Sequence, residues 1–253
     1  MIDSHCHLTD GKYTDSPDQL IQRAAAAGVN RIISIGTDPE DHPAVIGICH
    51  AHPTVRCAVG IHPNYCHEVD ESELTRLREV QADPCVLGLG EMGLDYHHNF
   101  ADHARQKKFF ESQLQLAVEV NKPVVIHCRE AFDDFFAIMA GFSSVRAVVH
   151  CFTGTIDEAR RSLDRGFLLG FTGIVTYKKS DDLREVARFI PADRMLVETD
   201  APYLSPEPMR KQKLNEPALV MHTAAAIASV RRTTVGEIDR MTTENAFNFF
   251  GKW

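Results

Sequence analysis

The sequence lacks the features that mark membrane and secreted proteins. No apolar run approaches the roughly 20 residues that a membrane-spanning helix needs, and the N-terminus has no basic region followed by an apolar one. We therefore expect a cytoplasmic protein that makes no membrane contact. Repeats, linkers and low-complexity tracts are also missing, so we expect a single domain over residues 1–253.

Closely spaced cysteine pairs are missing as well. The seven cysteines are odd in number and scattered, and none is spaced as Cys-x-x-Cys. Neither a disulfide framework nor a cysteine zinc site is indicated, and reduced thiols are the better interpretation. Cys6, Cys128 and Cys151 each adjoin a histidine, but strand alternation turns them to the opposite side, as expected for small buried hydrophobes.

The chain also lacks an excess of positive charge. The chain has 27 Lys and Arg against 35 Asp and Glu, a formal net charge of -8. A protein that coats nucleic acid through a broad basic face neutralises many phosphates with Lys and Arg, so this class is excluded. Phosphate chemistry in a cleft is compatible with the composition, because bound metal ions supply positive charge locally.

Short apolar runs rich in β-formers alternate with helical segments, which is typical of parallel βαβ units. Eight runs can be counted, at residues 1–6, 29–36, 56–61, 85–91, 123–128, 146–151, 166–172 and 194–199. Helix signals begin at Ser16-Pro17 and at Asp38-Pro39, continue at 101–120, 157–165 and 181–189, and predict two more helices after Glu216. The pattern predicts an α/β protein with a (β/α)8 barrel.

Side chains that can bind metals fall at the carboxyl ends of these runs, where barrel enzymes place their active sites. A lone histidine among the 13 in this chain is more simply a core or loop residue, but the shared position at several strand ends favours a metal centre. The candidates are His5, His7, His62, Glu91, His127, His150 and Asp200.

Four of these residues suggest particular roles. His5 and His7 are two apart, so an extended chain points both imidazoles to one side. Glu91 lies among glycines and has two oxygens with which to bridge two metals. A carboxylate that caps the next helix is the alternative, and it is less favoured because a charged residue at the end of an apolar strand must be paired or bind a metal. Asp200 can bind a metal and accept a proton, which makes it the candidate general base, with Glu198 as a supporting partner.

Two divalent ions roughly 3.5–4 Å apart would activate water and stabilise the leaving oxygen of a phosphodiester. Imidazole and carboxylate ligands suit zinc, manganese and, less well, magnesium. His62 and Arg129 are the candidate contacts to a substrate phosphate. Five basic residues are candidates for outer contacts to substrate phosphates, but a solvated surface position is the better interpretation of them. They are Lys178, Lys179, Arg210, Lys211 and Lys213.

Ordered motifs along nearly the whole chain give a resemblance to a known family. They are Ile2-Asp3-Ser4-His5-Cys6-His7-Leu8, Gly60-Ile61-His62-Pro63, residues 88–95, His127-Cys128-Arg129-Glu130-Ala131, His150-Cys151-Phe152-Thr153-Gly154, Glu198-Thr199-Asp200-Ala201-Pro202-Tyr203-Leu204 and Asn215-Glu216-Pro217. The chain resembles the TatD family of metal-dependent deoxyribonucleases, within the amidohydrolase-like barrels. Residues 210–214 depart from the family's usual glycine-containing basic stretch.

The resemblance implies a metal-dependent deoxyribonuclease of the 3'-5' exonuclease type. Single-stranded or frayed DNA ends would be the substrate, and a monomer is expected. The ligands would be His5, His7, Glu91, His127, His150 and Asp200, and the catalytic residues Asp200, Glu91 and His62.

Three other functions are compatible with such a site. One is deacylation of mischarged aminoacyl-tRNA. A second is hydrolysis of a small cyclic amide or lactone, although a modified lysine often bridges the metals there and Glu91 has that position here. The third, a metal-binding scaffold without turnover, is disfavoured because all six ligands are present.

Overall fold

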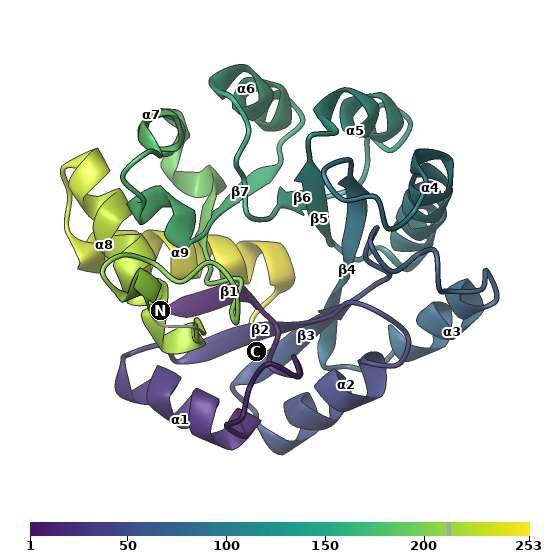
Figure 1. Ribbon diagram of the computed structural model, residues 1–253, viewed down its shortest axis with the longest axis horizontal. Coiled ribbons are helices and arrows are strands. Elements are labelled where there is room, and N and C mark those ends of the chain that lie inside the picture. The colour runs from purple at the N-terminus through teal and green to yellow at the C-terminus, as the bar shows by residue number, and fades with distance from the viewer. Residues whose placement is uncertain (212–213) are drawn as a thin grey trace. The chain divides into compact units, whose positions relative to one another are not determined.

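The computed structural model describes residues 1–211 and 214–253 (Figure 1). Its strands are β1 (Ile2–Cys6), β2 (Arg31–Gly36), β3 (Val55–Val59), β4 (Val86–Asp95), β5 (Val124–Arg129), β6 (Ala147–Val149), β7 (Leu168–Phe171) and β8 (Met195–Val197). Its α-helices are α1 (Pro17–Ala26), α2 (His42–Ala51), α3 (Glu73–Val80), α4 (His103–Val120), α5 (Phe132–Met139), α6 (Ile156–Asp164), α7 (Asp181–Phe189), α8 (Val220–Arg231) and α9 (Val235–Phe250).

The eight strands follow one another in chain order, with helices between them, which confirms the predicted (β/α)8 fold class. All eight predicted strands are present. Most of their residues are buried, as expected for parallel strands that are covered on both faces.

Two helices were not predicted, and the boundaries of α2 and β4 differ most from the prediction. The eight-residue helices α3 and α5 were not predicted, and neither begins with a side-chain cap that would mark its start. Helix α2 begins at His42 rather than near Asp38, because the Asp38 carboxylate accepts from the backbone N–H groups of Glu40 and Asp41 and forms a turn. Strand β4 continues past Glu91 to Asp95.

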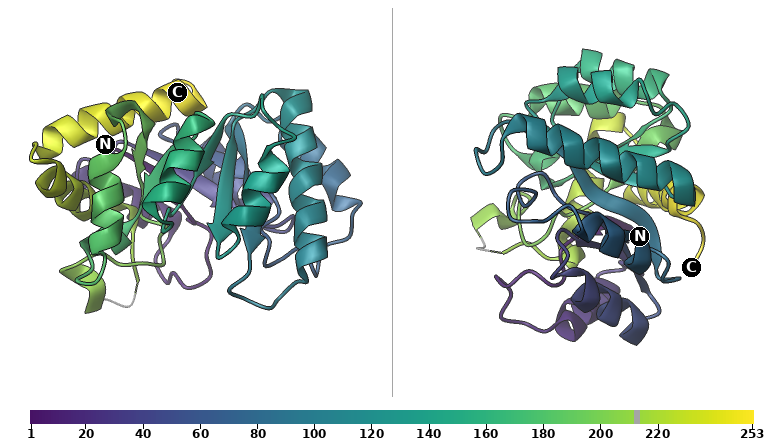
Figure 2. Two further views of the ribbon diagram at one scale, coloured as in Figure 1. Left: turned by 90° about the horizontal axis from the view of Figure 1, so that it is seen from above. Right: turned by 90° about the vertical axis from the view of Figure 1, so that its right-hand side faces the viewer.

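The chain divides into two compact units, of which the first comprises Met1–Ser34 and Cys151–Trp253. In this unit β7 pairs with β8, a parallel bridge between Cys6 and Ala201 joins β1 to the segment after β8, and β1 pairs with β2. Helix α9 contacts β8 and β1. The N-terminal ammonium lies 3.1 Å from Asp239 of α9, and the C-terminus follows that helix (Figure 2).

The second unit comprises Ile35–His150 and contains the parallel pairs β3–β4, β4–β5 and β5–β6. Helix α4 is the longest in this unit and contacts β4 with a buried face that includes Phe109, Phe110 and Leu114. Among the residues that the structure describes, no helix is both long and apolar enough to cross a membrane.

Candidate metal centre

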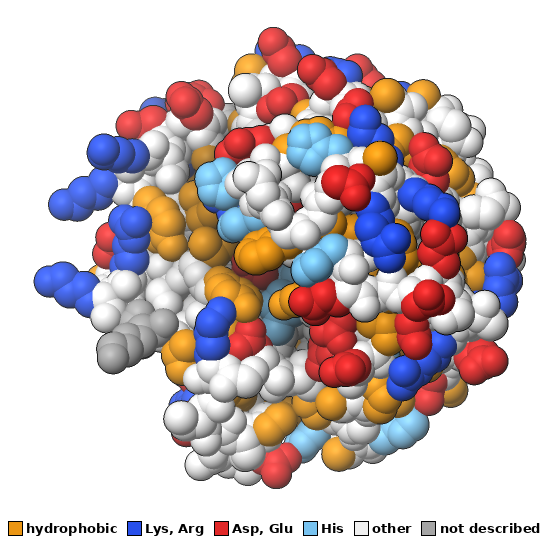
Figure 3. Space-filling view, turned by 45° about the vertical axis from the view of Figure 1, so that its right-hand side comes forward, with side chains coloured by type: hydrophobic (Ala, Val, Ile, Leu, Met, Phe, Trp, Pro, Cys, Tyr) orange, Lys and Arg blue, Asp and Glu red, His pale blue; other side chains and the backbone are white. Residues whose placement is uncertain are grey.

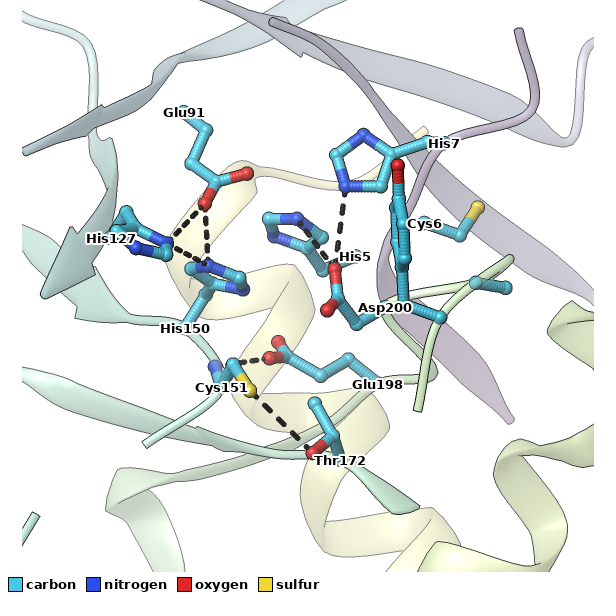
Figure 4. A network of polar contacts seen from close by, with 12 residues as sticks. His5, Cys6, His7, Glu91, His127, His150, Cys151, Thr172, Glu198 and Asp200 are labelled. Atoms are coloured by element: carbon cyan, nitrogen blue, oxygen red, sulfur yellow. Dashed lines mark hydrogen bonds and ion pairs between the residues drawn. The ribbon is translucent and has the colours of Figure 1, made fainter. Parts of the chain in front are cut away.

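The first unit brings together His5, His7 and Asp200, which we call the Asp200 cluster. The Asp200 Oδ1 atom lies 3.3 Å from His7 Nε2 and 3.7 Å from His5 Nε2. The two imidazole rings have centroids 5.1 Å apart. Figure 4 shows both rings joined to this carboxylate. One ligand atom from each residue lies within 4.8 Å of the others, a spacing that suits a shared cation.

Backbone pairing holds this cluster in place. The His5 carbonyl accepts from the Asp200 N–H at 2.9 Å, and the His7 N–H donates to the Ala201 carbonyl at 2.8 Å. Asp200 has φ 56°, in the left-handed region that non-glycine residues seldom adopt. Such conformations concentrate at functional sites, and here the turn follows β8 directly.

Two buried carboxylates form hydrogen bonds with the segments that carry the Asp200 cluster. Asp3 accepts from the Thr199 backbone at 2.9 Å and from its hydroxyl at 2.6 Å. Glu198 accepts from the Cys151 N–H at 2.6 Å and from the Ser4 hydroxyl at 3.3 Å, and Figure 4 shows the contact with Cys151. These bonds fix the two segments that carry His5 and Asp200, in the supporting role expected for Glu198.

The second unit brings together His62, Glu91, His127 and His150, which we call the Glu91 cluster. Glu91 Oε1 lies 2.6 Å from His150 Nε2, 2.9 Å from His127 Nδ1 and 3.4 Å from His62 Nε2. Figure 4 shows Glu91 joined to His127 and His150. Three imidazoles thus converge on one buried carboxylate.

The electrostatics of the Glu91 cluster keep its carboxylate ionised. Burial alone would raise the pKa of Glu91, but the imidazoles of His150, His62 and His127 hold it well below its usual value. Burial would lower the pKa of His127, yet the carboxylates of Asp95 and Glu91 raise it. Burial lowers the pKa of His62 despite the nearby Glu91. A buried anion surrounded by imidazoles is a ready ligand for a cation.

Glycines in β4 allow this convergence, as expected from the sequence. Gly90 and Gly93 both have positive φ, at 136° and 142°. A Cβ at Gly90 would collide with the Val125 carbonyl, and one at Gly93 with the His127 carbonyl. Close approach of β4 to β5 therefore depends on these residues, and it places Glu91 within reach of His127.

Asp95 belongs to this site and was missed from the sequence. Its Oδ2 lies 3.0 Å from His127 Nε2, on the opposite side of the ring from Glu91. The sequence does contain a signal for Asp95. Glu91 and Asp95 are four residues apart in β4, so strand alternation puts both side chains on the same face of the strand. The predicted strand ended at Glu91 and hid this relationship.

Two buried glutamines of α4 also support the Glu91 cluster. Gln113 accepts from the Ile61 N–H at 2.8 Å and donates to the Ile61 carbonyl at 3.0 Å, one residue before His62. Gln106 binds the backbone of Asp95 in the same two-way manner, at 2.8 and 2.9 Å. Helix α4 thereby fixes the segments that carry His62 and Asp95.

The basic side chains that are candidate phosphate contacts are exposed wherever the structure describes them. Arg129 ends β5 with an exposed side chain. Lys178, Lys179, Arg210 and Lys211 are exposed, and Arg210 lies over the Tyr177 ring at 4.0 Å. Lys213 is outside the described residues.

Comparisons with known proteins identify the family of this chain. The family model described as TatD related DNase matches residues 2–251. The chain is 37% identical to the metal-dependent hydrolase YabD of Bacillus subtilis, covering 99% of this chain and 98% of that one. It is also 37% identical to the 3'-5' ssDNA/RNA exonuclease TatD of Edwardsiella piscicida, covering 99% of each.

A solved structure shows the same fold. The TatD homologue YJJV of Escherichia coli superposes with a TM-score of 0.95 at 28% identity, covering 100% of this chain and 98% of that one. The chain belongs to the TatD related DNase family and is a metal-dependent hydrolase.

Proposed function

We propose that the protein is a 3'-5' exonuclease that hydrolyses single-stranded DNA or frayed DNA ends with divalent metal ions. The observation that carries the proposal is the pair of histidine–carboxylate clusters in a chain of this family. A relative from Edwardsiella piscicida is named as an exonuclease of this polarity on single-stranded DNA and RNA. Its substrate class is the one we extend to this chain.

We propose that each cluster holds one ion. His5, His7 and Asp200 would hold the first, and Glu91, His127 and His150 the second. The nitrogen and oxygen donors fit zinc and manganese, and magnesium less well. When bound, such ions supply an acidified water and positive charge for the leaving oxygen of a phosphodiester.

Asp200 is the proposed general base. Its carboxylate is partly exposed, with 15% of the side chain accessible, whereas Glu91 is 3% accessible. A proton acceptor needs access to the attacking water. Backbone hydrogen bonds from the Asp200 N–H to His5 and from the His7 N–H to Ala201 hold the turn that carries this carboxylate.

His62 is a proposed substrate contact rather than a metal ligand. Its Nδ1 accepts from the Asn64 N–H at 3.0 Å, so Nε2 carries the proton when the ring is neutral. A protonated Nε2 cannot ligate a metal, but it can donate to a phosphate oxygen. The lowered pKa of His62 favours this neutral donor form.

Single-stranded substrate needs stacking surfaces and a short cationic track. Tyr203 is 39% exposed, contacts the His7 ring edge-on at 6.1 Å, and has Lys12 Nζ 3.7 Å above its ring. We propose that a base stacks at Tyr203 with Lys12 contacting a phosphate, and, separately, that Arg129 contacts a substrate phosphate. On the face drawn in Figure 3 acidic and basic side chains are interspersed, in keeping with local recognition rather than a broad basic surface.

We further propose that the chain acts as one domain, as a monomer, and in the cytoplasm. The family model spans residues 2–251, which supports one functional unit. None of the seven cysteines, all of which lie within the described residues, forms a disulfide, which supports a reducing compartment. Light scattering at micromolar concentration tests the monomer directly.

The test is single-turnover cleavage of single- and double-stranded DNA labelled at either end. Metal-stripped protein is resupplied with Mg, Mn or Zn, and Asp200→Asn is the matched inactive variant. The proposal predicts metal-dependent shortening from the 3' end of single strands, lost in the variant. Intact metal binding without cleavage would contradict the nuclease and direct attention to aminoacyl-tRNA esters and small cyclic amides.

A further inference from the structure

Three buried cysteines meet in the second unit, away from the Glu91 cluster. Cys49 lies on α2, Cys57 on β3, and Cys85 immediately before β4. Their sulfur atoms all lie within 4.8 Å of one another, and the three residues are 3%, 0% and 6% exposed. The fold brings together positions that lie 8 or more residues apart, so the spacing along the sequence gave no sign of a cysteine site.

The sulfur separation fits a shared cation better than a disulfide. Cys57 Sγ and Cys85 Sγ lie 3.9 Å apart. Zinc–sulfur bonds of about 2.3 Å in a tetrahedral site put neighbouring sulfurs roughly 3.8 Å apart. A disulfide requires about 2.05 Å, and it would leave the third thiol unused.

A nitrogen donor and a carboxylate lie beside the thiols. His50 Nε2 lies 3.0 and 3.2 Å from the two carboxylate oxygens of Asp83, and ligand atoms of His50, Asp83 and Cys85 lie within 4.8 Å of one another. The His50 side chain is 60% exposed, so a cation has a route from solvent. Carboxylates that hold a metal-ligating histidine are a recurrent arrangement.

The charge around the thiols suits a divalent cation with thiolate ligands. Three thiolates and one divalent ion leave one negative charge. Lys122 Nζ donates to the Gln81 and Val86 carbonyls, the latter one residue after Cys85. Its ammonium group offsets that remaining charge in a partly buried position.

We propose that Cys49, Cys57 and Cys85 bind a soft d10 cation of the zinc type, with His50 Nδ1 as the fourth ligand and Asp83, which contacts Nε2, orienting the ring. The site joins α2, β3 and β4 near the amino ends of the two strands, where barrel enzymes hold stability rather than catalytic residues. Bound cation would stabilise this unit by mass action. The site does not depend on the proposed nuclease activity.

Cadmium titration of the reduced full-length protein tests the site. Excess Mn(II) first occupies the histidine–carboxylate clusters, and the thiolate-to-cadmium charge-transfer band is followed in the ultraviolet. One equivalent of Cd(II) is expected to produce the band and to raise the thermal midpoint. Cys57→Ser and Cys85→Ser should each lower the Cd(II) affinity at least tenfold, whereas Cys66→Ser, at a buried cysteine outside the group, should not.

Two further variants keep the test independent of folding defects. His50→Ala, at an exposed side chain, should weaken Cd(II) binding by about 10-fold and retain the band. The Cys49→Ala/Cys57→Ala/Cys85→Ala variant should lose the band. No band in the wild-type protein, or a band that survives the triple substitution, would overturn the proposal. A disulfide, seen before reduction as the loss of two hydrogens by mass, would also overturn it.

Discussion

Asp95 Oδ2 lies 3.0 Å from His127 Nε2, while the Nδ1 atom of the same ring lies 2.9 Å from Glu91. A carboxylate that accepts from one ring nitrogen leaves the other free of its proton and fixes the orientation of the ring. Asp95 is itself held through its backbone by Gln106. The His127 side chain is therefore presented to the Glu91 cluster by a chain of contacts that begins in α4.

Replacing Asp95 by Asn should weaken metal binding at the Glu91 cluster by about 10–100-fold, because a neutral amide holds the Nε2–H tautomer of His127 less firmly than a carboxylate does. Isothermal titration with Zn(II) or Mn(II) measures the affinity, and circular dichroism checks the fold. Asp193→Asn, at an exposed carboxylate before β8, is the matched control. Unchanged affinity in Asp95→Asn would remove Asp95 from the site.

Gly93→Ala should destabilise the protein by about 3 kcal/mol or more, because its Cβ would meet the His127 carbonyl and its φ of 142° strains any other residue. Urea unfolding measures the change. Gly47→Ala in α2 is the control: nothing lies within 4 Å of its Cβ, so it should be neutral or stabilising by up to about 1 kcal/mol. Equal effects of the two substitutions would refute the close-approach argument.

Features that depend on local sequence patterns could be predicted, whereas features that depend on contacts between distant segments could not. The strands and the seven residues at their carboxyl ends were predictable, because each is marked by a local apolar run followed by a polar side chain. Asp95 was lost because the strand's end was placed four residues early. Gln106, Gln113 and the three-cysteine group arise only from contacts between distant segments, which no local pattern encodes.

Acidification should lower the free energy of unfolding through the buried His42. Burial lowers its pKa, although its Nε2 bonds to the Gly60 carbonyl at 2.9 Å. Below the unfolded pKa of about 6.5 the unfolded chain binds the proton more tightly. The stability from His42 is therefore fully present above that pH and is lost as the pH falls.

Thermal unfolding between about pH 7.5 and 5.5 measures this loss. His42→Gln, which keeps a donor toward Gly60, should lose less stability on acidification than the wild-type protein. His103→Gln, at an exposed histidine, serves as the control. Parallel pH profiles for wild type and His42→Gln would show that His42 does not contribute.

Tyr203→Ala should raise KM for single-stranded DNA with little change in kcat, because a lost stacking contact costs about 1–3 kcal/mol of binding per base. Tyr203→Phe tests the ring alone, since it removes only the hydroxyl that donates to Asp10 at 2.7 Å. Steady-state cleavage of a labelled oligonucleotide gives both constants. A fall in kcat with unchanged KM would place Tyr203 in the chemical step instead.

Both histidine–carboxylate clusters should bind a metal ion, and anomalous diffraction from crystals soaked in Mn(II) or Zn(II) would show the ions. We predict one peak ligated by His5, His7 and Asp200 and a second ligated by Glu91, His127 and His150. Full metal loading with no peak at either cluster would show that neither cluster is a metal site.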